Sequence, residues 1–107
     1  MLQRQTNFSL EEIINYLRGG KFVRLPRCLL INELGAIVVN GEDQNHEGER
    51  LLIELLNSPH EAERATSYAL LSWCSWLAEK HAHTLGLFRD NNKEIMPRIE
   101  AMVAKAR

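Results

Sequence analysis

The hydrophobic positions of the chain follow the period of α-helices along most of its length. One apolar face predicts a first helix over residues 10–18. Its members are Leu10, Ile13, Ile14 and Leu17. Ser9 and Glu12 match a capping box, in which each side chain bonds the other residue's backbone amide. Gly19-Gly20 then ends the helix, because glycine adopts the left-handed conformation without steric cost.

Residues 21–40 are compatible with two structures. Apolar residues at near-helical spacing favour a helix over residues 26–39, with Pro26 in its first turn. Against this, Gly35 interrupts the segment, and the β-branched residues that follow it are typical of strands. We favour the helix and keep a hairpin in 21–40 as the alternative.

Three further helices are predicted in the second half of the chain. A polar loop over residues 40–48 precedes a short leucine-rich helix over 48–57. Ser58, Pro59 and Glu61 then form a second helix start, from which a long helix runs to about Ala82. From Tyr68 to Leu77 its apolar residues cover nearly the whole circumference, which predicts a central position. After a break at Leu85-Gly86, the last helix spans 92–106, with Pro97 in its first or second turn.

Together these elements predict an all-α fold of about five helices, arranged as a helical-hairpin array or an irregular bundle. A length of 107 residues fits a single domain, residues 1–107. A content of 45% hydrophobic and 25% charged residues argues against disorder. An α+β fold follows only if the hairpin in 21–40 forms.

The stretch from Leu51 to Ala65 resembles a HEAT-type helical repeat. Paired leucines, the Ser58-Pro59 turn and Arg64 in the following helix carry the resemblance, which covers about one repeat, residues 51–82. Glu63 departs from it, because these repeats prefer a valine there. The resemblance implies a scaffold that presents helix faces to another protein.

The charges are distributed unevenly, although the net charge is only −1. Residues 1–40 carry a net +2, residues 41–63 a net −6 and residues 64–107 a net +3. Such an asymmetry can mark a binding surface. The acidic segment is therefore the first candidate surface, for a basic protein partner. Its candidate residues are Glu42, Asp43, Glu47, Glu49, Glu61 and Glu63.

Trp73 and Trp76 supply a second candidate surface. On one continuous helix, residues three positions apart share a side. If one of the two is exposed, it can anchor a partner or a second copy of the chain, because tryptophan is enriched at interface centres. Self-association as a homo-oligomer is therefore a further hypothesis.

A basic run supports an alternative function. Arg18, Lys21, Arg24 and Arg27 recur at intervals of three, with Phe22 among them. Such residues can contact phosphates, so the alternative is a nucleic-acid-associated regulator whose 26–39 helix takes part in a helix-turn-helix-like arrangement. Nucleic acid is the less favoured partner, because the sequence pI of about 6.4 is far from basic.

Candidate chemistry is sparse. His81 and His83 diverge by about 200° on a helix and cannot share a metal there. Cys74 lies between two tryptophans, where a thiol has poor reactivity. We therefore predict a non-enzymatic protein–protein interaction module or small adaptor, with no cofactor and no metal. Without a signal peptide or an apolar span of about 20 residues, we expect a cytoplasmic protein with no membrane partner.

Overall fold

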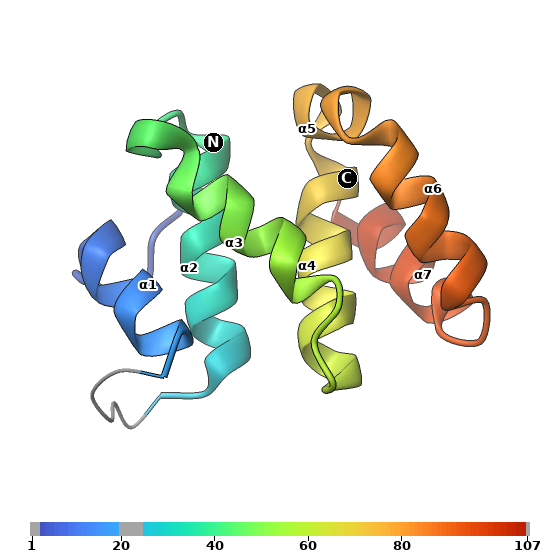
Figure 1. The fold of residues 1–107 in the computed structure, drawn as a ribbon, viewed down its shortest axis with the longest axis horizontal. Helices are drawn as coiled ribbons and strands as arrows, with labels where there is room; N and C mark the ends of the chain where they lie inside the picture. Colours follow the sequence, from blue (N-terminus) through green and yellow to red (C-terminus); the bar gives the residue numbers. More distant parts are fainter. Residues whose placement is uncertain (1–2, 20–24, 107) are drawn as a thin grey trace.

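The computed structural model describes residues 3–19 and 25–106, which form seven α-helices, one 3-10 turn and no strand (Figure 1). The helices are α1 (Leu10–Leu17), α2 (Arg27–Val39), α3 (Glu47–Leu55), α4 (Glu61–Trp73), α5 (Ser75–Lys80), α6 (Ala82–Asn91) and α7 (Met96–Ala106), and the 3-10 turn is η1 (Gln44–His46). The predicted all-α class is confirmed for these residues. The predicted number of about five helices is too low, because the second half of the chain contains more breaks than its apolar pattern indicates.

Helix α4 occupies the middle of the fold, with α1 to α3 on one side and α5 to α7 on the other (Figure 1). It packs against α2, α3, α5 and α7. Leu34 of α2, Leu52 of α3 and Leu71 of α4 are completely buried in the shared core. The apolar stretch from Tyr68 to Leu77 predicted this central position, and its first part lies on α4.

Helix α1 begins and ends as predicted. The Ser9 hydroxyl accepts the Glu12 amide at 3.1 Å, and the Glu12 carboxylate accepts the Ser9 amide at 3.0 Å. Gly19 follows the helix with a φ of +93°, a conformation that side chains disfavour. Both features depend only on neighbouring residues, which explains why the local pattern predicts them. Gly20 lies outside the described residues.

The segment after Pro26 is a helix, and the alternative hairpin is wrong. Helix α2 runs through Gly35 because the missing side chain there makes room for α4. A β carbon at Gly35 would lie only 2.6 Å from a terminal methyl of Leu70. The β-branched Ile37 and Val38 are buried in the helix, so their packing outweighs a weak preference for strands.

The long helix predicted from Ser58 to about Ala82 is not continuous. Ser58 is not its N-cap, because α4 begins only after His60 and the Ser58 hydroxyl instead donates to Glu63 at 3.2 Å. Cys74 then interrupts the helix with an extended backbone, at φ −86° and ψ 116°. The break turns α5 away from α4 while Leu77 remains completely buried.

The last part of the chain contains two helices where one is predicted. Gly86 lies inside α6 rather than at a break. Tyr68 of α4 and Phe88 of α6 stack with their ring centres 4.7 Å apart, which holds α6 on the core. Pro97 is the second residue of α7 and so lies in its first turn, one of the two turns predicted, where its missing N–H costs no hydrogen bond.

Candidate functional site

The acidic segment 41–49 is organised as a helix start. Asp43 precedes η1 and α3, and its two carboxylate oxygens accept the backbone amides of Gly48 at 2.7 Å and Glu49 at 2.9 Å. These amides lack partners inside the helix, so the carboxylate satisfies them and interacts well with the positive end of the helix dipole. Glu42 and Glu47 are exposed.

Glu49 is the centre of an ion-pair network between α3 and α5. Its side chain is only 4% exposed and lies 2.8 Å from Lys80 Nζ, 2.6 Å from His81 Nε2 and 3.2 Å from His46 Nδ1. Burial by itself raises the pKa of Glu49, but the hydrogen bonds from Lys80, His81 and His46 together lower this pKa to about 2. The network forms because the break at Cys74 directs the end of α5 towards α3.

We expect this network to make stability depend on pH in acid. The pKa of Glu49 in the folded protein, about 2, lies below the ordinary value of 4.5. The stabilisation is therefore complete above pH 4.5 and is lost as the pH falls towards about 2. Unfolding midpoints in urea, measured for the wild type and for Glu49→Gln, should converge over this range. A difference between the two midpoints that stays constant down to a pH of about 2 would contradict the expectation.

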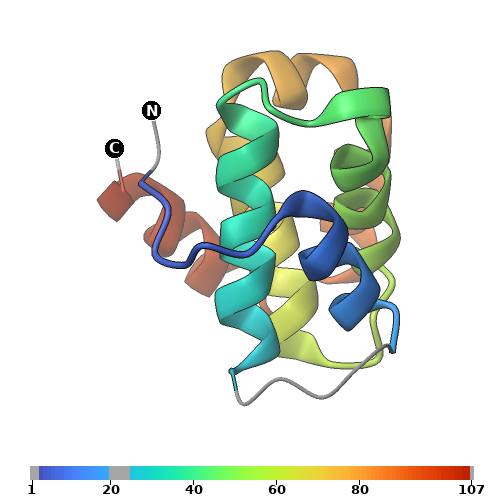
Figure 2. The same ribbon diagram turned by 90° about the vertical axis from the view of Figure 1, so that its left-hand side faces the viewer.

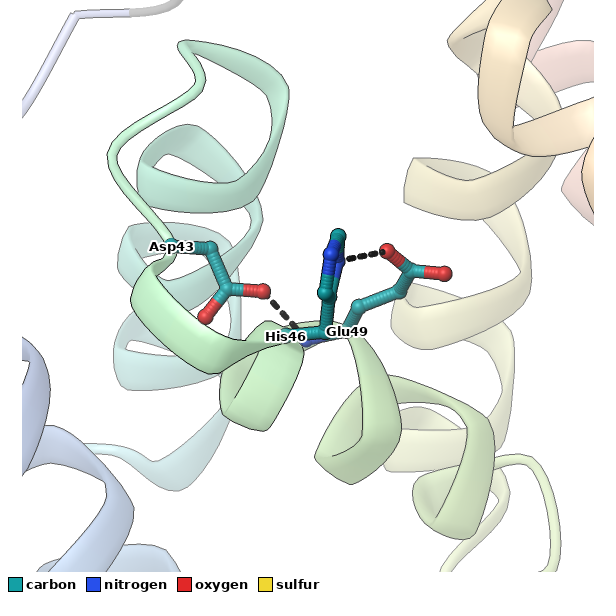
Figure 3. A group of neighbouring side chains, drawn as sticks. All are labelled: Asp43, His46 and Glu49. Carbon is teal, nitrogen blue, oxygen red and sulfur yellow. Dashed lines mark hydrogen bonds and ion pairs between the residues drawn. The ribbon is translucent and has the colours of Figure 1, made fainter.

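Asp43, His46 and Glu49 place three potential metal-ligand atoms within 4.8 Å of one another (Figure 3). Their own contacts explain this arrangement. Both Asp43 oxygens cap α3, and Lys80 lies 2.8 Å from Glu49, where its ammonium group would repel a cation. The geometry therefore fits a helix cap and an ion pair, and the contacts contain no feature that requires a metal.

Glu63 and Glu61 take part in two different contacts. The buried Glu63 carboxylate binds the Arg27 guanidinium through two contacts, of 2.9 and 3.3 Å, and thereby joins α4 to α2. Burial raises the pKa of Glu63, but hydrogen bonding and the charge of Arg27 outweigh it, so the net shift is downward. Glu61 is exposed and lies 3.1 Å from Arg98 of α7.

The six acidic candidates therefore do not form one exposed surface. Glu49 and Glu63 are buried and bind cations of their own chain, and Asp43 caps a helix. Only Glu42, Glu47 and Glu61 are exposed. Sequence reasoning could not separate these two groups, because a buried paired carboxylate and an exposed one have the same pattern along the chain.

The structure also places two of the four basic candidates. Arg18 lies 3.1 Å from Glu54, and Arg27 pairs with Glu63. Both arginines and both glutamates line one open cleft of about 590 Å³, so its charges balance. A phosphate would have to compete with these carboxylates. Lys21 and Arg24 lie outside the described residues.

Trp73 and Trp76 do not share one helix face. The break at Cys74 separates them, since Trp73 ends α4 and Trp76 lies in α5. Trp76 is 43% exposed. Trp73 is half-buried and lines a groove between α2, α4 and α7. The prediction that the two residues share one side of a continuous helix is therefore wrong, because the helix ends between them.

This apolar groove is the feature that sequence analysis missed. It has a volume of about 240 Å³. Its lining consists of Asn32, Thr66, Ala69, Leu70, Trp73, Met102 and Val103. None of these side chains is charged, and Met102 is 51% exposed although it lies among apolar neighbours. Met102 belongs to the apolar stripe of the last helix, but the stripe alone does not show that its side chain is exposed rather than buried in the core.

Comparisons with protein-family models, with curated protein sequences and with solved structures found no match. None of the described helices has the length and apolar character that crossing a lipid bilayer requires.

Proposed function

We propose that this chain is a non-enzymatic protein-interaction module, and that the apolar groove binds an amphipathic helix of a partner protein. The observation that supports the proposal most directly is the exposure of Met102 at an uncharged groove formed by three helices. Exposed apolar side chains that gather at one place often mark binding surfaces, because covering them removes apolar area from water.

The dimensions of the groove favour a protein partner over a small ligand. Its volume of about 240 Å³ lies below the range of about 300–1,000 Å³ that is typical of small-molecule pockets. A space of this size fits the anchoring side chains of a helix, whose remaining length lies along the surface. Ala69 and Thr66 are small residues on α4 that leave room for such anchors.

The character of the lining indicates the chemistry of the partner helix. Leu70, Trp73 and Met102 offer apolar contact, and methionine adapts to differently shaped side chains. Asn32 is exposed and adds an amide that both donates and accepts hydrogen bonds. We therefore expect an apolar helix face that carries one polar group. The basic partner expected from the acidic segment would need a different surface, one that includes the exposed Glu42 and Glu47.

Met102→Lys tests this proposal, with Leu87→Lys as the matched control. Met102 and Leu87 are 51% and 50% exposed, but only Met102 lines the groove. Amphipathic helical peptides are selected from a displayed library against the wild type, and their affinities are measured by fluorescence polarisation. We expect Met102→Lys to weaken binding about tenfold or more, because it places a charge in an apolar contact. Leu87→Lys should bind like the wild type.

Two results would overturn the proposal. One is the recovery of no binding peptide, and the other is equal affinity of the peptides for both lysine variants. Mass measurement by light scattering over a range of concentrations adds a separate check. A dimer that Met102→Lys dissociates would identify a second copy of the chain, rather than another protein, as the occupant of the groove.

A further inference from the structure

The N-terminal segment of residues 3–8, here called the strap, is attached to α2 through one buried carboxylate. Glu33 is 2% exposed and accepts the backbone amides of Gln5 at 2.9 Å and Thr6 at 2.7 Å. The Thr6 hydroxyl also donates to Glu33, and Arg4 Nε lies 3.4 Å from it. Figure 2 shows the strap crossing α2 before the chain enters α1.

Glu33 remains ionised in this arrangement. Burial raises the pKa of Glu33, but the hydrogen bonds from Thr6 and Gln5, together with that from Arg4, lower it overall. An ionised carboxylate makes stronger hydrogen bonds than a neutral one. Few other contacts hold the strap, since Gln3, Gln5 and Asn7 are exposed and only Phe8 packs a large apolar side chain against the core.

The strap forms a wall of a second cavity that adjoins the apolar groove. This strap cavity has a volume of about 260 Å³. Gln3 and Gln5 line it from the strap, and Leu29, Glu33 and Ala36 line it from α2. Asn32 and Leu70 line both the strap cavity and the apolar groove, so the two spaces meet at these residues.

We propose that the strap is a displaceable wall of the strap cavity, and that its release from Glu33 extends the adjoining apolar groove along α2 and strengthens binding there. The polar contacts with Glu33 can break while most of the core stays covered, because Phe8 is the only large apolar side chain of the strap that packs against it. Segments with few buried apolar contacts open locally at low cost. Release would expose Leu29, Ala36 and the Glu33 carboxylate beside Leu70 and so lengthen the groove along α2. This inference rests on the proposed function of the groove.

Hydrogen exchange tests strap release without any ligand. In Thr6→Val and in Glu33→Gln, the backbone amides of residues 5 and 6 should exchange about tenfold faster than in the wild type. Buried amides of α2, such as that of Ile37, should keep their exchange rates. Thr6→Val retains the carboxylate, so it remains informative if Glu33→Gln does not fold. Asn7→Ala is the control, because it changes an exposed strap residue and leaves the Glu33 contacts intact. Unchanged exchange in Thr6→Val would overturn the strap inference.

Binding to the groove supplies the second measurement, with the helical peptides selected against the wild type as probes. Release should raise their affinity several-fold, because a closed strap reduces the fraction of binding-competent molecules. If Met102→Lys abolishes binding but the strap variants bind like the wild type, the strap inference fails and the proposed function stands. If Met102→Lys has no effect, the proposed function itself fails, whatever the strap variants show.

Discussion

Glu49→Gln is expected to lower the free energy of unfolding by about 2–3 kcal/mol at neutral pH. The substitution preserves the shape of the side chain but removes its negative charge from the network with Lys80, His81 and His46. Removing one partner of a fully buried pair costs about 3–5 kcal/mol. We expect a smaller loss because the side chains of Lys80 and His46 are 48% and 65% exposed and can return to water.

Glu47→Gln is the matched control for this prediction. Glu47 lies in the same first turn of α3 but is exposed. Its contribution through the helix dipole is about 0.3–1 kcal/mol, so its loss should be clearly smaller. Urea unfolding at neutral pH measures both variants. Equal destabilisation would show that the charge of the helix start matters and the network with α5 does not.

Leu71→Ala is expected to lower the free energy of unfolding by about 2–5 kcal/mol. Leu71 lies on the central helix α4 and is completely buried, so the substitution removes apolar contacts on every side and leaves a cavity. The range is wide because the loss depends on how far the neighbouring helices relax into the space. Thermal and urea unfolding, followed by circular dichroism, measure the change.

Leu70→Ala is the neighbouring control. Leu70 is only half-buried and lines the apolar groove and the strap cavity. Its truncation should cost about 1 kcal/mol of stability, because part of the side chain already faces water. Its larger effect should be weaker binding of the helical peptides. If Leu70→Ala and Leu71→Ala destabilise the protein equally, the groove is part of the core and offers no binding surface.

The predictions that succeed depend on residues that are close in the sequence. The capping box of Ser9 and Glu12 forms within one helical turn, so its pattern is sufficient to locate the start of α1. The helix after Pro26 also follows from apolar periodicity. The HEAT-like relation of residues 51–82 stays a prediction. Arg64, which supports that resemblance, does make a local contact, since it donates to the Ser58 carbonyl at 2.8 Å.

The predictions that fail concern contacts between distant segments. The extended backbone at Cys74 has no proline or glycine that marks it in the sequence, and the break places Lys80 and His81 beside Glu49 of a distant segment. The same break separates Trp73 from Trp76. Gly86 is a residue where a helix end is predicted and none occurs. Glycine favours a helix end locally, but Gly86 lies inside α6, and the stacking of Phe88 on Tyr68 holds this helix in place.

The sequence by itself therefore determined the start of α1 and the central role of the helix that contains Leu71, and it favoured the all-α class while leaving a hairpin in 21–40 as the alternative. Periodicity and capping carry this information, because they depend on residues within about one or two turns of each other. Only the tertiary structure decided which carboxylates are buried, where the long helix breaks and which apolar residues form the groove. These properties depend on the free energy of contacts between residues far apart in the chain, and a local sequence pattern does not show which segments will contact one another.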